Sequence, residues 1–380
     1  MRFPGLVPGL GATDRRPEVT EVADKTHRFE QAAADTDQSG VERVTNTGAA
    51  PLVRAAPKVP VCNRIASFSK HNGPPVDFPL TAAGQHSLSE SNAVSPTLKT
   101  ERQVVVPDFA DIVELPTHVG DKGFWPEFEP IVDLQLARRQ GGAASEHFKT
   151  PKIFDGFSTE QAAQAVRADF PTKFPTDLVE QFLAEGVRPD PKIIPQRSAA
   201  EFTRGPVGYG AIIGEMILNA SPSCFAAKWS EGRARPEEVA WLIHTGQISA
   251  PCSIREKVAQ LGLKRPEDFT AYEEGCPRHP AWPAMHSAAS CASTYLAVVM
   301  DLSPQQIAEA RRVDWAVATS RSLAGVHYAT DNSAGLMIGQ EAVRRTLPEY
   351  LQRKFGADPD AVRQKLDTVF YDWTKHDPFA

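Results

Sequence analysis

The sequence predicts an all-α protein. From about residue 158 onward apolar residues recur every three or four positions, as Ile212, Ile213, Met216 and Ile217 do, which is the period of a buried helix. Alternation of apolar and polar residues is nowhere sustained enough to predict a sheet, and the sequence contains no internal repeat. A helical bundle is therefore the expected architecture.

Proline residues mark the ends of the first expected helices, because proline breaks a helix interior and is favoured in the first turn. Pro171 and Pro175 separate the first two helices, Pro222 ends a buried one, and Pro236 opens another. The helices expected on these grounds cover residues 159–163, 178–183, 209–220, 224–235 and the segment that begins at 236.

Small residues and a capping box place the later helices. The Ala- and Ser-rich run at residues 286–300 suits one closely packed central helix, because small side chains let neighbouring backbones approach. Ser303 and Gln306 form a capping box with Pro304 at the first helical position. The helices expected here cover residues 286–300, 304–323, 334–354 and 360–373.

The first hundred residues differ from the rest of the chain. They are rich in Ser, Thr, Asn, Asp, Pro and Ala, and the first Trp and first Tyr are Trp125 and Tyr209. Such a composition offers little burial to offset the entropy of ordering the backbone. We therefore expect four parts, namely an extended or disordered N-terminal arm (1–105), a peripheral segment draped over the bundle (106–200), a helical core with the candidate catalytic residues (201–355), and a C-terminal helix and tail (356–380).

Composition excludes several classes of protein. Lys and Arg number 41 against 47 Asp and Glu, so the net charge of −6 disfavours a nucleic-acid or anionic-membrane binder. No apolar run approaches the about 18 residues that a membrane span needs, and Pro4 and Gly5 interrupt the place of a signal peptide. Five irregularly spaced cysteines are too few for a disulfide framework or a CxxC zinc site. We expect a soluble protein, and its compartment stays open.

Two cationic residues are the first candidate functional group. Lys228 and Arg235 are seven residues apart, which on a continuous helix puts both on one face. Two cations that face the same way favour an anion between them. The alternative is a solvated basic face on which Lys228 pairs with Glu231.

A proline-rich turn supplies the second group. Residues 278–285 lead to His286, and a turn that delivers backbone N–H groups and a histidine to a helix N-terminus can bind an anion. The alternative is that His286 is satisfied by its own helix.

The third group spans Arg321 to Asp331. Gly325 can end a helix and turn the chain, so that His327 meets Asp331. The carboxylate would accept one imidazole N–H and leave the other nitrogen as a ligand or nucleophile. The alternatives are an ordinary N-cap for Asp331 and a surface ion pair for Arg321.

These groups spell KxxxxxxRP, PxxH and SRxxxxxHxxxD, in that order. Together they resemble the signature of the acid phosphatase (PAP2) and vanadium-dependent haloperoxidase superfamily, over about residues 202–340. The resemblance implies a helical bundle of the PAP2/vanadium haloperoxidase type with a long irregular N-terminal arm.

The resemblance also implies a role for each residue at a tetrahedral oxyanion site. The anion, vanadate or phosphate, would be bound by Lys228, Arg235, Arg321 and the backbone N–H of Met285. His327 would be the axial vanadium ligand, or the nucleophile of a phosphatase, with Asp331 holding its ring. His286 would act as general acid and base, Lys228 would polarise hydrogen peroxide, and His279 stands where bromoperoxidases carry a histidine that tunes protonation.

The second motif departs from the family. The usual Pro-Ser-Gly-His is Pro-Ala-Met-His here, so Ala284 lacks a hydroxyl that would donate to the oxyanion. The loss of one donor of several weakens anion binding by about 1–3 kcal/mol.

The resemblance favours a vanadate-dependent haloperoxidase that oxidises a halide, bromide or iodide before chloride, with hydrogen peroxide to hypohalous acid. Residues 228–237 are similar to the corresponding segment of algal-type bromoperoxidases, and the long N-terminal extension and lack of membrane spans agree with it. The alternatives are a soluble acid phosphatase with a phosphohistidine intermediate and a non-catalytic or cofactor-free homologue. A small organic acceptor and a homo-oligomer, in which the arm wraps a partner subunit, are left open.

Overall fold

The computed structural model describes residues 104–169, 172–205, 208–273, 275–277 and 280–375. Every regular element in these ranges is a helix, and their β pairing is limited to two isolated bridges, Ala143 with Ser158 and Pro189 with Met300. The prediction of an all-α protein is confirmed. The α-helices are α3 (Phe124–Gln140), α4 (Thr159–Asp169), α5 (Lys173–Ala184), α6 (Gln196–Phe202), α7 (Tyr209–Glu231), α8 (Pro236–His244), α9 (Cys252–Gln260), α10 (Met285–Ala289), α11 (Ala292–Val299), α12 (Pro304–Leu323), α13 (Ala329–Phe355) and α14 (Pro359–Val369).

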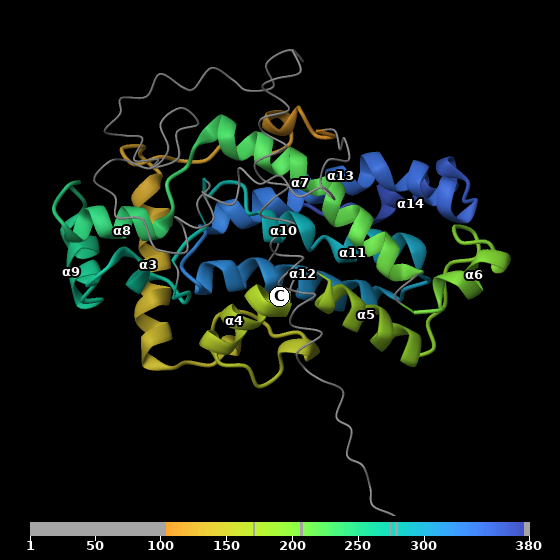
Figure 1. The fold of residues 1–380 in the computed structure, drawn as a ribbon, viewed down its shortest axis with the longest axis horizontal. Coiled ribbons are helices and arrows are strands. Elements are labelled where there is room, and N and C mark those ends of the chain that lie inside the picture. The colour runs from red at the N-terminus through yellow and green to blue at the C-terminus, as the bar shows by residue number, and fades with distance from the viewer. Residues whose placement is uncertain (1–103, 170–171, 206–207, 274, 278–279, 376–380) are drawn as a thin grey trace, which may run out of the picture.

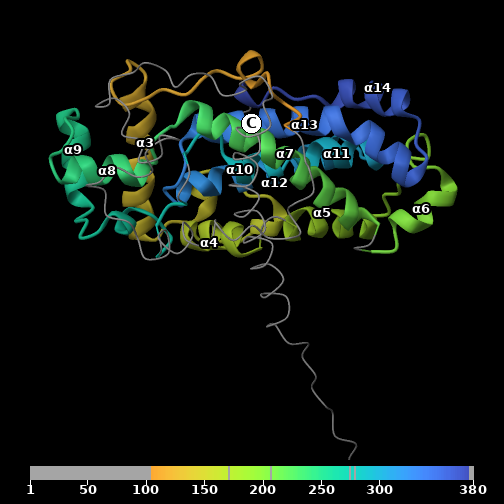
Figure 2. The same cartoon turned by 45° about the horizontal axis from the view of Figure 1, so that its top comes forward.

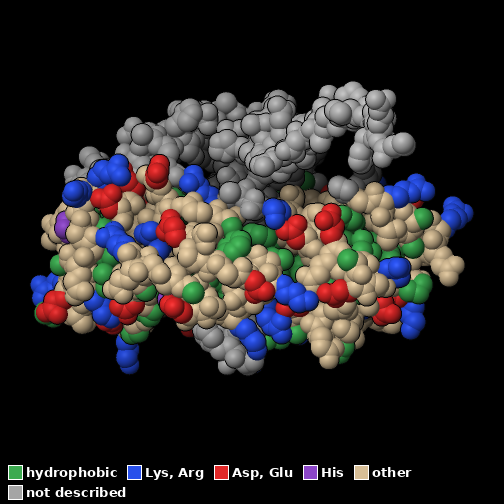
Figure 3. Space-filling view, turned by 90° about the horizontal axis from the view of Figure 1, so that it is seen from below, with side chains coloured by type: hydrophobic (Ala, Val, Ile, Leu, Met, Phe, Trp, Pro, Cys, Tyr) green, Lys and Arg blue, Asp and Glu red, His purple; other side chains and the backbone are tan. Residues whose placement is uncertain are grey.

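The long helices α7, α12 and α13 run along the molecule with α10 and α11 among them (Figure 1). α10 packs against α7, α12 and α13, so the short helix that carries His286 lies at the centre of the bundle. α3, α8 and α9 gather at one end, where α3 crosses the direction of the long helices (Figure 2). On the face drawn in Figure 3, acidic and basic side chains are interspersed.

Two glycines let α10 approach α13 closely. A Cβ atom on Gly335 or Gly339 of α13 would overlap the carbonyl oxygen of Ala284 or Ala288, respectively. Glycine is needed at both positions because only a residue without a side chain admits backbone at this separation. The two glycines therefore fix the depth at which the second sequence motif lies against the third.

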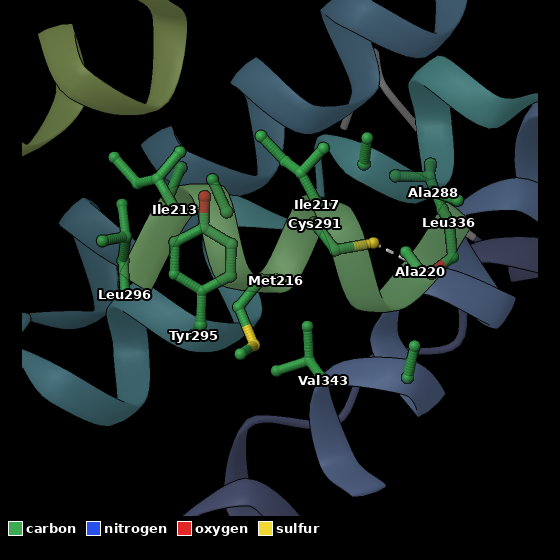
Figure 4. Packing of buried hydrophobic residues seen from close by; sticks show 14 of the residues in the cluster. Ile213, Met216, Ile217, Ala220, Ala288, Cys291, Tyr295, Leu296, Leu336 and Val343 are labelled. Atoms are coloured by element: carbon green, nitrogen blue, oxygen red, sulfur yellow. Dashed lines mark hydrogen bonds between the residues drawn. The ribbon is translucent and has the colours of Figure 1, made fainter. Parts of the chain in front are cut away.

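The apolar core fills the space between α7, α11 and α13 (Figure 4). Ile213, Met216 and Ile217 of α7 face Tyr295 and Val343, and all five side chains are buried. Burial of this kind contributes about 25 cal/mol per Å² of apolar surface, so these contacts hold the helices of the site in register.

The prediction that Pro222 ends a helix is wrong. α7 continues through Pro222 and stops only at Glu231, where Gly232 adopts a left-handed conformation with φ of 62°. Proline removes one backbone donor, but the helix is buried on both sides of it, at Ile217 and Phe225, and apolar burial offsets the loss.

The prediction of one helix over residues 286–300 is also wrong. The chain breaks between α10 and α11 because Asp314 of α12 caps the second helix from outside. The two oxygens of its carboxyl group accept the backbone N–H groups of Ala292 and Ser293 at 3.0 and 2.9 Å. The break is a tertiary effect, since it depends on a side chain more than twenty residues away.

The helix over residues 304–323 is confirmed as α12, and Ser303 accepts the N–H of Gln306 in the predicted capping box. α13 begins at Ala329 and not at residue 334, and α14 ends at Val369 and not at residue 373. Pro175 lies in the first turn of α5, where a missing N–H breaks no helical hydrogen bond. Helices α3, α6 and α9 were not predicted.

The predicted N-terminal arm lies outside the described residues, apart from its last two. Cys62 lies there too, whereas Cys224, Cys252, Cys276 and Cys291 are free thiols. The division into four parts stays a prediction.

Candidate functional site

The end of α12 is built to place His327. Gly325 has φ of 77°, its N–H donates to Ser322 O at 2.9 Å, and the N–H of Val326 donates to Arg321 O at 3.1 Å. These two bonds form a Schellman motif, the standard way for glycine to end a helix and reverse the chain. A side chain at Gly325 would also collide with Gln135, which donates to the last carbonyl groups of α12.

The turn brings His327 to Asp331. The imidazole Nδ1 lies 3.0 Å from Asp331 Oδ2, and both residues are buried. The same oxygen accepts the backbone N–H of Tyr328 at 3.0 Å, so Asp331 closes a capping box from the third position of α13, and Tyr328 is the N-cap that the alternative interpretation placed at Asp331. Capping and contact with the imidazole are thus joined in one carboxylate.

Arg235 sets the tautomer of His327. Its Nη1 atom lies 2.9 Å from His327 Nε2 and donates to Val326 O at 2.7 Å. A guanidinium can only donate, so Nε2 is the acceptor and the ring proton is on Nδ1, which donates to Asp331. His327 therefore turns an unprotonated nitrogen toward a cation.

Lys228 and Arg235 come together, but not on one helix. Lys228 lies in the last turn of α7, and Arg235 is the N-cap of α8 beyond the Gly232 turn, so the shared-face argument is wrong. Lys228 Nζ donates to the carbonyl oxygens of Pro280 and Ala281 at 2.8 and 3.0 Å. Both cations are buried, with 0% and 1% exposure, which rules out the solvated basic face.

Arg321 is the third cation, and it is equally buried. Its Nη1 atom donates to Tyr272 Oη at 2.6 Å, so the surface ion pair is wrong. Its Nε atom is buried and donates to no atom of the described residues. A buried guanidinium N–H without a partner costs free energy, and an anion would satisfy it.

These three side chains, the site cations Lys228, Arg235 and Arg321, all act on His286 through their charges. Burial, together with the charges of the site cations, holds the pKa of His286 well below its usual range. The imidazole is therefore neutral at pH 7.

The turn before His286 is tied to the third motif. The N–H of Ala284 donates to Asp331 O at 2.8 Å, so this amide is not available to an anion. Met285 is buried and begins α10, which at five residues is too short to act through a helix dipole. The anion site therefore depends on side chains more than on this helix N-terminus. His279, the remaining predicted site residue, lies outside the described residues.

Sequence reasoning missed Arg233 and Glu127. Arg233 donates to Asp331 Oδ1 at 2.7 Å and to Glu127 Oε2 at 2.5 Å, and it is fully buried. Burial raises the pKa of Glu127, but the charge and hydrogen bonds of Arg233 outweigh this effect and lower it. The only signal in the sequence is a second arginine two residues before Arg235, and α3, which carries Glu127, was itself not predicted.

In the described part of the chain, no three His, Cys, Asp or Glu side chains are grouped to hold a metal ion. None of its helices is long and apolar enough to cross a membrane.

No family model matches the chain, and no curated protein matches it. Among solved structures, the chain is similar to the homohexameric vanadate-dependent bromoperoxidase AnII from Ascophyllum nodosum, with 15% identity and a TM-score of 0.35. The match covers 83% of this chain and 65% of that one, so the chain spans less than two thirds of that protein's length. At this distance the likeness bears on neither family membership nor activity.

Proposed function

We propose that this protein binds vanadate and acts as a vanadate-dependent haloperoxidase, which oxidises bromide or iodide with hydrogen peroxide to hypohalous acid. The observation that carries the proposal is the contact of buried Arg235 with the imidazole of His327, together with two further buried cations, Lys228 and Arg321, whose charges act with that of Arg235 on a second imidazole, His286. The resemblance of the three motifs to the superfamily supports it.

The residues present fit a tetrahedral oxyanion. Buried cations that lie close together repel one another, and a bound anion would offset that repulsion. The Nε atom of Arg321 has a donor to offer, and guanidinium groups suit oxyanions because their N–H groups form a planar fork. Vanadate and phosphate share this shape and charge.

In this proposal each side chain has one task. Lys228, Arg235 and Arg321 bind the oxygens of the anion, and Met285 adds its backbone N–H. His327 presents Nε2 to it, with Asp331 fixing the ring through Nδ1. When bound, vanadate supplies a Lewis acid that activates hydrogen peroxide toward halide. His286, which is neutral, can take a proton from hydrogen peroxide, and Lys228 polarises the peroxide by hydrogen bonding.

A soluble acid phosphatase is the second candidate, and the tautomer of His327 fits it as well as it fits a vanadate ligand. An unprotonated Nε2 can attack phosphorus, which breaks the bond to the leaving alcohol, and His286 would protonate that alcohol. The negative charge of the substrate would first have to raise the pKa of His286, because the site cations lower it.

One pair of assays separates the candidates. The protein is loaded with orthovanadate and assayed for peroxide-dependent bromide and iodide oxidation, and it is assayed without vanadate for hydrolysis of p-nitrophenyl phosphate. We expect halide oxidation that requires vanadate. Phosphate ester hydrolysis without any halide oxidation would assign the phosphatase, and neither activity would favour the non-catalytic homologue.

Substitution of His327 tests the site itself. His327→Ala should abolish whichever activity is found, because it removes the ligand or nucleophile. His244→Ala, at an exposed position on α8, is the matched control and should keep it. Full turnover in His327→Ala would refute the site. Use of an organic acceptor and homo-oligomerisation stay predictions.

A further inference from the structure

The strongest unassigned feature of the molecule is the chain of contacts behind His327. It runs from Glu127 through Arg233 and Asp331 to the imidazole. Arg233 is not part of any of the three motifs, and Glu127 belongs to α3, a hundred residues earlier in the chain.

Both oxygens of Asp331 are occupied, and by different partners. Oδ2 faces His327 Nδ1 and the N–H of Tyr328, each at 3.0 Å, whereas Oδ1 accepts from Arg233 Nη1 at 2.7 Å. A carboxylate held at one oxygen can still rotate about its last bond, but one held at both oxygens cannot. Arg233 therefore fixes the plane of the carboxylate that orients the imidazole.

Arg233 is itself held from four sides. It donates to Glu127 at 2.5 and 3.2 Å and to the hydroxyl groups of Thr117 and Thr330 at 3.0 and 2.9 Å. Its guanidinium lies over the ring of Tyr328, 3.8 Å from the centroid. Thr117 in turn donates to Glu127 at 2.9 Å, so the whole group is closed by mutual hydrogen bonds.

The shape of the guanidinium group is a second reason why an arginine is needed at position 233. An arginine with two carboxylates can bridge them because its two terminal nitrogens point along separate directions, which a lysine cannot reproduce. By bridging Glu127 and Asp331, Arg233 joins α3 to the start of α13. Helix packing alone would not prevent the Asp331 carboxyl group from rotating.

We infer that Arg233, anchored on Glu127, is a positioning residue that holds the Asp331 carboxylate, and through it the His327 ring, in the orientation that turns Nε2 toward the site cations. This inference deepens the proposed function, because the orientation of Nε2 matters to activity only if an oxyanion binds there. Its structural part, the control of the His327 ring, can be tested without any oxyanion.

The test is nuclear magnetic resonance of the imidazole in the full chain, with the ring nitrogens labelled by 15N histidine. His327→Gln identifies the signals. In the unaltered protein we expect a single tautomer with the proton on Nδ1. In Arg233→Lys, which keeps the charge but loses the bridge, and in Arg233→Gln we expect a mixture of tautomers or broadened signals. Lys257→Met removes exposed ion pairs from Glu129 and Asp133 of α3 and should leave the signals unchanged.

Arg233→Gln leaves the buried carboxylate of Asp331 and the partly buried one of Glu127 without their arginine and can fail to fold. Glu127→Gln then decides, because it keeps a side chain of the same size with one acceptor oxygen and removes the negative charge that anchors Arg233. Altered His327 signals in the folded Glu127→Gln or Arg233→Lys protein support the inference. Signals identical to those of the unaltered protein in both variants overturn it.

Activity gives a second readout. Whichever activity the protein has, Arg233→Lys should lower kcat about 10- to 100-fold, the usual effect of losing a group that orients a ligand, with little change in KM. If the unaltered protein has no activity and binds no oxyanion, the proposed function fails while the resonance experiment still decides the role of Arg233.

Discussion

The backbone N–H of Ala284 donates to the carbonyl oxygen of Asp331 at 2.8 Å, which joins the second sequence motif directly to the third. Gly335 and Gly339 make this contact possible, because any side chain at either position would collide with the backbone of α10. The position of His286 relative to His327 is therefore set by main-chain contacts, and side-chain changes at Ala284 should act on anion binding more than on this geometry.

Ala284→Ser adds a hydroxyl where the superfamily that the three motifs resemble carries one, and we expect it to tighten the binding of phosphate or vanadate by about 1–3 kcal/mol. The reason is that the hydroxyl adds a donor to a pocket that now depends on the site cations. Titration calorimetry on Ala284→Ser and on the unaltered protein measures the difference in affinity. Equal affinities would mean that residue 284 does not face the anion.

Anion binding should take up a proton at His286. Burial and the site cations lower the pKa of His286 in the unliganded protein, and a bound anion offsets those charges, so its pKa rises on binding. At a pH between the unliganded and the anion-bound pKa of His286, the complex holds a proton that the unliganded protein lacks. The affinity for the anion should therefore increase as the pH falls through this range.

Sulfate is a suitable probe of this effect, because its own charge does not change near neutral pH. Calorimetry in buffers with different ionisation enthalpies would report the proton uptake, and His286→Gln should remove it. Sulfate binding with the same proton uptake in His286→Gln as in the unaltered protein would show that His286 is not the group that takes up the proton.

Asp314 should make the free energy of unfolding depend on pH. Burial raises its pKa to about 8, against about 4 in an unfolded chain. The native state thus keeps a proton that the unfolded state has lost, so through this group stability falls as the pH rises from about 4 to about 8. Urea unfolding at about pH 5, 7 and 9 should show a shallower fall in Asp314→Asn. The same pH dependence in both proteins would show that Asp314 is not the titrating group.

The close approach of α10 and α13 should make Gly339 sensitive to a single methyl group. Gly339→Ala forces the helices apart and should lower the free energy of unfolding by about 1–3 kcal/mol. Gly214→Ala is the control, since a Cβ atom there meets nothing within 4 Å, and alanine should stabilise α7 by about 0.5–1 kcal/mol. Thermal or urea unfolding compares the two, and a Gly339→Ala protein as stable as the control would contradict the packing argument.

Local signals in the sequence were enough to predict the parts of the site that depend on neighbours in the chain. Gly325 ends α12 and brings His327 to Asp331 because a left-handed residue reverses the chain wherever it occurs. The capping box at Ser303 is local in the same way, and it fixed the start of α12.

The sequence was least informative where a side chain far away in the chain determines the local structure. Asp314 divides the Ala-rich segment into two helices, and burial carries α7 through Pro222, although neither effect leaves a periodic pattern. The same holds for Glu127 and Arg233, whose pairing across a hundred residues has no spacing that could reveal it. Residue type identified the site cations, but only the packing of α7, α8 and α12 brings the charges of all three to act on His286.

A crystal soaked with orthovanadate tests the central claim most directly. We expect one vanadate in contact with Lys228, Arg235 and Arg321 and bonded to His327 Nε2. Vanadate bound elsewhere, or these side chains left without an anion at a saturating concentration, would contradict the account.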